Sequence, residues 1–233
     1  MFKKDGGEKM PNKSKIIVLQ GISCSSKTLI KDFLTGKLNV REMADTLKEY
    51  SETENVEIQK NIFNLISKFN QDFKYFDQVL TTTTRELRMG EEKMVDYRFV
   101  TKDEFKSYLK HEKVLEHVVN FGDYYGTLFE DINLAIESGN HLVAAIDLSG
   151  AMEYKYFFPG KTVVIHMKSD IETMINRLQI RSSKPDDIER RKKEAPIQEI
   201  GSEYANYVVD SRKRIDVVFR EILDIIEKEC KTK

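Results

Sequence analysis

Residues 15–28 read KIIVLQGISCSSKT, and this stretch decides the fold. Its first part, KIIVLQ (15–20), is a short apolar run of the kind that forms a buried parallel strand. A loop of small residues follows, and residues 27–34 predict a helix capped near Gly36. A helix that starts directly behind such a loop favours an anion, because its free backbone N–H groups and its dipole both attract negative charge.

The loop GISCSSKT (21–28) has the spacing of the phosphate-binding motif G-x-x-x-x-G-K-[ST], except that Ser26 replaces the second glycine. A glycine allows backbone angles that a Cβ hinders, so Ser26 weakens the match. The pattern predicts that Lys27 reaches the β- and γ-phosphates of ATP and that the Thr28 hydroxyl holds Mg²⁺. The ATP-binding residues we expect are Gly21, Ile22, Ser23, Cys24, Ser25, Ser26, Lys27 and Thr28.

Two plainer interpretations of this loop stay open. It could be a turn of small residues that only happens to contain Lys-Thr. Cys24 could have a lowered thiol pKa, because a helix N-terminus and Lys27 are near it. We favour the simpler interpretation for Cys24, that of a small residue that fills the turn.

Composition limits the remaining function classes. The chain has 233 residues, 40% of them hydrophobic and 33% charged, which fits one α/β domain with smaller inserted subdomains. A formal net charge of −1 offers no broad field for nucleic acid or an anionic membrane. Cys24 and Cys230 have no metal or redox spacing, and no apolar run approaches the ~20 residues of a membrane span. Without a secretion signal, we expect a cytoplasmic protein with no nucleic-acid or membrane partner.

Strands and helices alternate along the rest of the chain, which favours a parallel sheet covered on both faces. The expected strands are 79–84, 96–100, 113–121, 141–147, 161–167 and 207–209, and FGDYYGT (121–127) is interpreted as a turn. Helices are expected at 129–138, 150–158 and 214–230, with capping boxes at Thr101/Glu104 and Ser169/Glu172 opening two more. Residues 37–73 predict a helical insertion, whose packing face holds Ile58, Ile62, Leu65, Ile66 and Phe69.

The segments TTTTRELRMGE, VDYRFVTKDEF, KVLEHVVNFGDYYGT and AAIDLSGA are similar to those of guanylate kinases in order and spacing. The chain resembles this family from about Lys15 to Glu229. The resemblance implies a phosphate-loop fold of three α/β/α layers with a mainly parallel sheet, a small GMP-binding subdomain and a mobile lid. It also implies Mg²⁺-dependent transfer of the ATP γ-phosphate to GMP, with ATP and GMP as the small-molecule partners of a monomer or homodimer.

The resemblance assigns the substrate residues. A dianionic phosphate needs converging cations and hydroxyls, and the family supplies them at the positions of Arg85, Arg88, Tyr97 and Tyr125. Guanine presents adjacent N1–H and N2–H₂ donors, and Glu116 and Asp147 stand where the family uses carboxylates near them. Thr81 and Thr127 match positions whose hydroxyls meet O6, and Asp147 also stands near the metal. Adenine would leave such buried polar groups unpaired, which is how a site of this kind rejects it.

Arginines bracket the helix break at SSKPDD (182–187), where the family has a lid. Arg177, Arg181 and Arg191 are the expected catalytic cations beside Lys27, because the transition state spreads negative charge over the γ-phosphoryl oxygens. Lys192 and Lys193 are interpreted as a solvated helix face. The predicted division is a disordered segment 1–14, a core of 15–36, 74–84, 128–177 and 192–233, the insertion 37–73, the GMP-binding subdomain 85–127 and the lid 178–191.

The sequence departs from the guanylate kinase pattern in three places. Cys24 and Ser26 stand at usual glycine positions, the segment 37–73 is enlarged, and Asp210-Ser211 replaces a common Asn. A kinase for another small phosphorylated molecule and a catalytically weak or inactive binding module therefore remain alternatives.

Overall fold

The computed structural model describes residues 14–37, 46–72, 76–87, 92–94, 97–120, 122–181 and 183–230. Of Ile66, residues 70–72 and Asn120, the described part is the backbone alone. Apart from Ser14, the predicted disordered segment 1–14 lies outside the described residues, as do Arg88 and part of the predicted insertion. Among the described helices, none combines the length and the apolar character that crossing a membrane requires.

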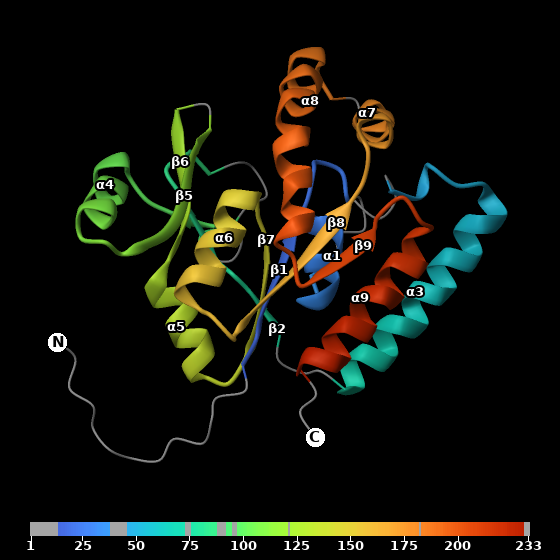
Figure 1. Cartoon of the computed structure of the whole chain (residues 1–233), viewed down its shortest axis with the longest axis horizontal. Coiled ribbons are helices and arrows are strands. Elements are labelled where there is room, and N and C mark those ends of the chain that lie inside the picture. Colours follow the sequence, from blue (N-terminus) through green and yellow to red (C-terminus); the bar gives the residue numbers. More distant parts are fainter. Residues whose placement is uncertain are drawn as a thin grey trace.

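Five parallel strands form the main sheet, in the order β2-β7-β1-β8-β9 (Figure 1). They are β1 (Ile16–Gln20), β2 (Phe76–Gln78), β7 (His141–Ala145), β8 (Thr162–Lys168) and β9 (Tyr207–Asp210). Every residue of β1 is buried, as expected of a central parallel strand covered on both faces. The strands predicted at 15–20, 141–147, 161–167 and 207–209 are confirmed, although β7 ends at Ala145, before Asp147.

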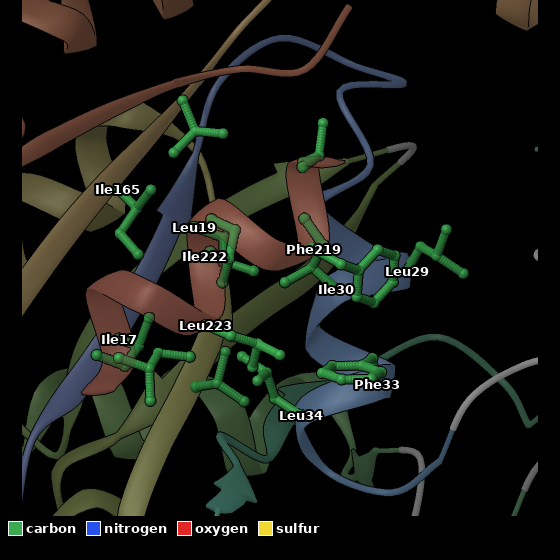
Figure 2. Packing of buried hydrophobic residues seen from close by; sticks show 14 of the residues in the cluster. Ile17, Leu19, Leu29, Ile30, Phe33, Leu34, Ile165, Phe219, Ile222 and Leu223 are labelled. Atoms are coloured by element: carbon green, nitrogen blue, oxygen red, sulfur yellow. The ribbon is translucent and has the colours of Figure 1, made fainter. Parts of the chain in front are cut away.

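Alternate residues of β1 pack into two different cores, because successive side chains of a strand point to opposite faces. Ile17 and Leu19 join the core formed with α1 (Lys27–Leu34), α3 (Glu52–Asp72) and α9 (Ile215–Cys230). Figure 2 shows Leu19, Phe33 and Phe219 gathered in this core, and the rings of Phe33 and Phe219 meet edge to face at 4.7 Å. Ile16 and Val18 face α5 (Phe129–Glu137) and α6 (Leu148–Phe157). The three-layer α/β/α prediction is confirmed.

A second sheet of four strands has the order β4-β3-β6-β5. It consists of β3 (Thr81–Thr83), β4 (Arg98–Phe99), β5 (Val114–Asn120) and β6 (Asp123–Leu128), and α4 (Lys102–Lys110) packs on it through the buried Phe105. The predicted capping box of Thr101 and Glu104 opens α4 and is confirmed.

Two predictions for this region are wrong. The sequence predicts residues 81–83 as part of the core, but β3 pairs with β4 and β6 of the second sheet. Residues 121–127 were interpreted as a turn, but β6 pairs with both β3 and β5. Gly126 suggested a turn in the sequence, whereas in the fold it permits close packing of strands: a Cβ there would lie 2.5 Å from the Glu116 carbonyl oxygen.

Two helices follow β8, and the expected break between them is confirmed. They are α7 (Ile171–Ile180) and α8 (Pro185–Glu199), and a short 3₁₀ helix, η1 (Ile200–Glu203), follows α8. The predicted capping box at Ser169 is wrong, because Asp170 caps α7 by accepting a 2.7 Å hydrogen bond from the Thr173 N–H. Because the Asp170 carboxylate is the acceptor in place of the Ser169 hydroxyl, α7 begins one residue later than predicted.

The inserted helix α3 lies side by side with α9 (Figure 1). Ile58, Ile62 and Phe69 are buried in the core, and Leu65 packs against it, as the sequence predicted. Asn61 Nδ2 donates a 2.7 Å hydrogen bond to Asp216 Oδ2 at the start of α9. The inserted segment is therefore an integral part of the main core.

Candidate functional site

The phosphate loop, residues 21–28, runs from the end of β1 into α1. It opens at Gly21, whose φ is 145° and where a Cβ would lie 2.5 Å from the Met167 carbonyl oxygen. A side chain cannot fit there, so glycine is required by the neighbouring strand β8. Ser25 Oγ donates a 2.8 Å hydrogen bond to the Ile22 carbonyl and closes the loop on itself.

Cys24 and Ser26 have left-handed backbone conformations, with φ of 57° and 64°. These are the two positions where the sequence comparison expected glycine. A left-handed conformation costs a residue with a Cβ roughly 1–2 kcal/mol. The loop thus keeps the backbone path that glycines would give it. Contacts with the surrounding fold hold these two residues in their strained conformations.

Lys27 folds over the loop. Its Nζ donates to the carbonyls of Gly21 at 2.7 Å and Ile22 at 2.6 Å, and to Ser25 Oγ at 3.3 Å. Burial lowers the pKa of Lys27 to about 8, and the charge of Arg191 adds to this effect. The ammonium is therefore held at the centre of the loop, next to the backbone groups that would surround a phosphate.

Cys24 lies in the same loop, but its thiol is not activated. Burial raises the pKa of the Cys24 thiol above its ordinary value, and this effect outweighs the charges of Arg181, Arg191 and Lys27. The possibility of a lowered pKa, left open by the sequence, is therefore wrong. The plain structural interpretation stands, because Cys24 packs against the small apolar cluster of Ile22 with α7 and α8.

A cavity of about 820 Å³ opens in front of the phosphate loop. The cavity is also lined by Asp147, which caps α6, and by residues of α7, α8 and the β5–β6 hairpin. The Asp147 carboxylate caps α6 by accepting a 2.8 Å hydrogen bond from the Gly150 N–H. Residues that line the cavity include Gly21, Ile22, Ser23, Cys24, Lys27, Thr28, Val118, Val119, Asp147, Arg181, Arg190, Arg191 and Gln198.

The predicted catalytic arginines divide into two groups. Arg181 and Arg191 line the cavity, and Arg191 Nη1 lies 2.5 Å from Ser23 Oγ while its Nε pairs with Asp187. Arg177 is absent from the lining among the described residues. It is buried behind the loop, where Nη1 donates a 3.0 Å hydrogen bond to the Cys24 carbonyl. The structure thus places Arg177 against the loop backbone and the other two arginines in front of it.

The predicted guanine-binding residues meet on the second sheet. Thr127 of β6 lies opposite both Thr81 of β3 and Glu116 of β5, so the three side chains share one face. Thr127 Oγ1 donates a 2.7 Å hydrogen bond to Glu116 Oε1. Burial raises the pKa of the Glu116 carboxyl, the Thr127 hydrogen bond lowers it, and the charge of Asp147 raises it again. Although they come from three strands, these residues form one polar group.

The predicted phosphate-binding residues lie on the same sheet. Tyr125 is two residues from Thr127 on β6 and therefore shares its face. The rings of Tyr97 and Tyr125 meet edge to face at 6.4 Å, and the Arg85 guanidinium lies 4.9 Å from the Tyr97 ring centroid. Arg85, Tyr97 and Tyr125 are thus brought together, while Arg88 is outside the described residues.

Three further residues belong to this region and were not singled out from the sequence. Arg190 lines the cavity and pairs with Asp187 and Glu194. Tyr154 of α6 is fully buried, and burial together with the Glu116 charge raises the pKa of its hydroxyl. Glu49 pairs with Arg177, which donates a hydrogen bond to the Cys24 carbonyl of the phosphate loop. The RRKK run could have indicated Arg190, but no local pattern marks Tyr154 or Glu49.

A buried strand, a phosphate loop and a helix at the carboxyl edge of a parallel sheet define the phosphate-loop class of nucleotide-binding proteins. The fold resembles the crystal structure of guanylate kinase from Anaplasma phagocytophilum, with a TM-score of 0.58 at 18% identity over 94% of this chain and 88% of that chain. A family model described as guanylate kinase matches residues 42–229. The chain belongs to the guanylate kinase family.

Individual relatives agree. The chain is 39% identical over 136 residues to the guanylate kinase of Chlamydia trachomatis serovar D, covering 58% of this chain and 65% of that protein. It is 36% identical over 147 residues to the guanylate kinase of Chlamydia caviae, covering 62% and 72%. With that of Mycoplasma genitalium it shares 30% identity over 167 residues, covering 71% and 68%. The chain therefore spans slightly less than two thirds of the C. trachomatis relative.

Proposed function

We propose that this protein is a guanylate kinase enzyme that transfers the γ-phosphate of ATP to GMP and releases ADP and GDP. The observation that carries the proposal is the register of the second sheet. It sets Thr81, Thr127 and Glu116 side by side on one face, with the Glu116 carboxylate already engaged by the Thr127 hydroxyl. A carboxylate beside hydroxyls suits guanine, which offers two adjacent donors and one acceptor.

The phosphate loop supports ATP as the donor. The Lys27 ammonium is held against the loop at the N-terminal end of α1, where the free backbone N–H groups of a helix favour an anion. Arg181, Arg190 and Arg191 line the same cavity, and Arg191 reaches Ser23 of the loop. Cations around a nucleotide phosphate can stabilise the charge that spreads over the γ-phosphoryl oxygens during transfer.

The acceptor side supports a nucleoside monophosphate. Arg85, Tyr97 and Tyr125 would bind the dianionic phosphate of GMP, and Arg88 would join them. The Glu116 carboxylate would accept from guanine N1–H and N2–H₂, with Thr81 and Thr127 near O6 and Asp147 near the amino group. The GMP phosphate is already anionic, so no strong general base is needed. We propose direct in-line transfer between the two nucleotides without a phosphoenzyme.

The residues present fit Mg²⁺. This ion keeps several waters and takes one or two protein ligands together with substrate phosphates, so it needs no dedicated cage of carboxylates. Within the described ranges, no group of three metal-binding side chains occurs, while the Thr28 hydroxyl and the Asp147 carboxylate both line the cavity. Thr28 would hold the ion and Asp147 would hold it through water. Bound Mg²⁺ would neutralise phosphate charge during transfer.

We further propose that residues 178–191 close as a lid and exclude water during transfer. Ile22 of the loop packs against Met174 and Leu178 of α7 and Ala195 of α8, so an apolar contact joins the lid region to the phosphate loop.

Both cysteines are free thiols, which supports a reducing compartment such as the cytoplasm. A monomer or a homodimer is compatible with this reaction.

A coupled assay of ADP release tests the proposal. ATP and Mg²⁺ are supplied with GMP, AMP, CMP or UMP in turn, and Lys27→Ala serves as the control. The proposal expects release that depends on GMP and is lost in the variant. If no monophosphate stimulates release while GMP still binds in a titration, the chain is a binding module. Release driven by another small phosphorylated molecule would instead indicate a different kinase.

A further inference from the structure

Glu49, in the inserted segment, contacts a buried arginine that holds the phosphate loop. Arg177 Nε lies 2.7 Å from Glu49 Oε1, and the side chains are 8% and 21% exposed. The contact is an ion pair whose N–H direction is poorly aligned, so Nε makes no hydrogen bond to a described residue. The other end of the guanidinium donates a 3.0 Å hydrogen bond to the Cys24 carbonyl.

The position of this contact matters because of the loop's backbone. Cys24 and Ser26 both have left-handed conformations that a Cβ makes unfavourable. A loop of this kind relaxes unless neighbouring groups hold it. Arg177 binds the carbonyl of the first strained residue, and Glu49 supplies the opposite charge that keeps this buried cation in place.

Glu49 is itself fixed to the main core. Leu47 is buried in that core, and the Tyr50 hydroxyl accepts a 3.2 Å hydrogen bond from the Ile215 N–H at the start of α9. A carboxylate between these two anchors has a defined position. The inserted segment can therefore transmit the rigidity of the α3–α9 layer to the phosphate loop.

We propose that Glu49 is a positioning residue for the nucleotide phosphates, acting through Arg177 on the Cys24 carbonyl. The proposal deepens the function proposed above and rests on it, because it assigns the inserted segment to the ATP-binding half of that site. It also predicts an unusual direction for the change in phosphate affinity when Glu49 is replaced. Removing a carboxylate near a phosphate site would by charge alone tighten anion binding, whereas loss of this support weakens it.

The test is the affinity for ADP, measured by titration calorimetry with folded wild-type protein, Glu49→Gln and Glu49→Ala. Both variants are expected to bind ADP about tenfold more weakly, within the range measured for coupled neighbours. GMP affinity should stay within twofold, because Glu49 pairs with Arg177 at the phosphate loop, whereas the residues proposed to bind guanine lie on the second sheet. Glu52→Gln is the matched control, since it removes the same charge from the exposed start of α3.

An Arg177→Gln variant completes a double-mutant cycle. If Glu49 acts through Arg177, the Glu49→Gln change should alter ADP affinity less than twofold in the Arg177→Gln background. Equal losses in both backgrounds would overturn the proposed route. Should Arg177→Gln fail to fold, Arg177→Lys keeps the charge without the forked contact and takes its place.

Unchanged or tighter ADP binding by Glu49→Gln would overturn the positioning role, and a lower melting temperature with unchanged ADP affinity would show a merely structural contact. Failure of the proposed function is seen separately, as a wild-type protein that binds ADP but releases none from ATP with GMP. In that case the ADP affinities still decide the role of Glu49. A wild-type protein that binds no ADP would overturn both proposals.

Discussion

Cys24 and Ser26 lie two residues apart in the phosphate loop, and both have left-handed backbone conformations with φ of 57° and 64°. Ser26 is also the residue that precedes the first helical residue of α1, and its side chain makes no capping hydrogen bond. Serine is favoured at this position when its hydroxyl caps the helix. Here it carries the strain of a Cβ without that compensation.

We therefore expect Ser26→Gly to stabilise the protein. Relief of the left-handed strain is worth roughly 1–2 kcal/mol, and the greater freedom of glycine in the unfolded chain removes part of this gain. The expected net effect is an increase of about 1 kcal/mol in the free energy of unfolding, measured by urea denaturation. Tighter ADP binding should accompany it.

Ser25→Gly is the matched control for this change. Ser25 has no positive φ, and its hydroxyl donates a hydrogen bond to the Ile22 carbonyl. Glycine there should destabilise the protein by about 1 kcal/mol, from the lost hydrogen bond and added chain entropy. Similar effects from both substitutions would contradict the strain argument.

The pKa of Lys27 predicts how ADP affinity depends on pH. In the free protein this pKa is lowered to about 8, mainly by burial. Phosphate binding favours the charged ammonium, so the pKa in the complex is higher and binding takes up a proton above pH 8. ADP affinity should fall as pH rises through 8, by up to about tenfold per unit, and it should be independent of Lys27 titration below pH 7.

Calorimetry in buffers of different ionisation enthalpy measures that proton uptake directly. Lys27→Arg is the control, because the guanidinium stays charged over this range. Its ADP affinity is expected to be weaker at neutral pH but flat between pH 7 and 9.5. A wild-type affinity that is equally flat would show that Lys27 remains charged in the free protein.

Local signals explain why the core and the loop could be predicted from the sequence. β1 is an unbroken apolar run, and the loop and α1 follow it directly, so neighbouring residues carry the whole pattern. The face of α3 was predictable for the same reason, since Ile58, Ile62 and Phe69 recur at helical spacing. The guanine-binding group required the family resemblance, because Thr81, Glu116 and Thr127 meet only through strand pairing.

Other features depend on contacts between distant residues and left no local signal. β3 is three residues long, and its sheet is decided by its partners β4 and β6. The sequence predicts Arg177 as a catalytic cation, but its position depends on Glu49 and on the Cys24 carbonyl. The cap of α7 is a different case, because Ser169 and Asp170 are adjacent and both good caps, so local signals do not decide between them.

Replacing the Glu116 carboxylate should have opposite effects on the stability of the protein and on its affinity for GMP. Burial and nearby carboxylates raise the pKa of Glu116, so keeping it charged at neutral pH costs the folded state free energy. Glu116→Gln should therefore leave the melting temperature unchanged or higher at pH 7. GMP affinity should fall roughly 10- to 100-fold, because a charged hydrogen-bond acceptor contributes about 1.5–3 kcal/mol.

The pH dependence gives a second measurement of the same role. Because the folded-state pKa is raised, Glu116 gains a proton earlier than an ordinary glutamate as pH falls. GMP affinity should decrease through that transition, while ADP affinity should not follow it. In Glu116→Gln this part of the GMP profile should be absent. A wild-type GMP affinity that is constant from pH 7 to pH 4.5 would count against a charged Glu116 in the complex.

Gly201, in η1, packs against Gln20 where the end of α8 meets the start of the phosphate loop. Gln20 is the last residue of β1, directly before the loop, and its Nε2 donates a 2.8 Å hydrogen bond to the Gln198 carbonyl. Its Oε1 lies 2.6 Å from His166 Nδ1. A Cβ at Gly201 would lie 2.2 Å from that oxygen. Since Gln20 and His166 are fully buried, the side chain has no room to retreat.

Gly201→Ala should therefore displace Gln20 and destabilise the protein by about 1–3 kcal/mol, through overpacking and lost hydrogen bonds. Urea denaturation of the single variants and of Gln20→Ala/Gly201→Ala measures this coupling. In the Gln20→Ala background the alanine at 201 meets no amide, so its additional cost should fall below about 0.5 kcal/mol. An equal cost in both backgrounds would contradict the packing argument, because it would mean that Gln20 plays no part. Loss of ADP affinity in Gly201→Ala, with GMP affinity retained, would place this contact on the phosphate-loop side of the site.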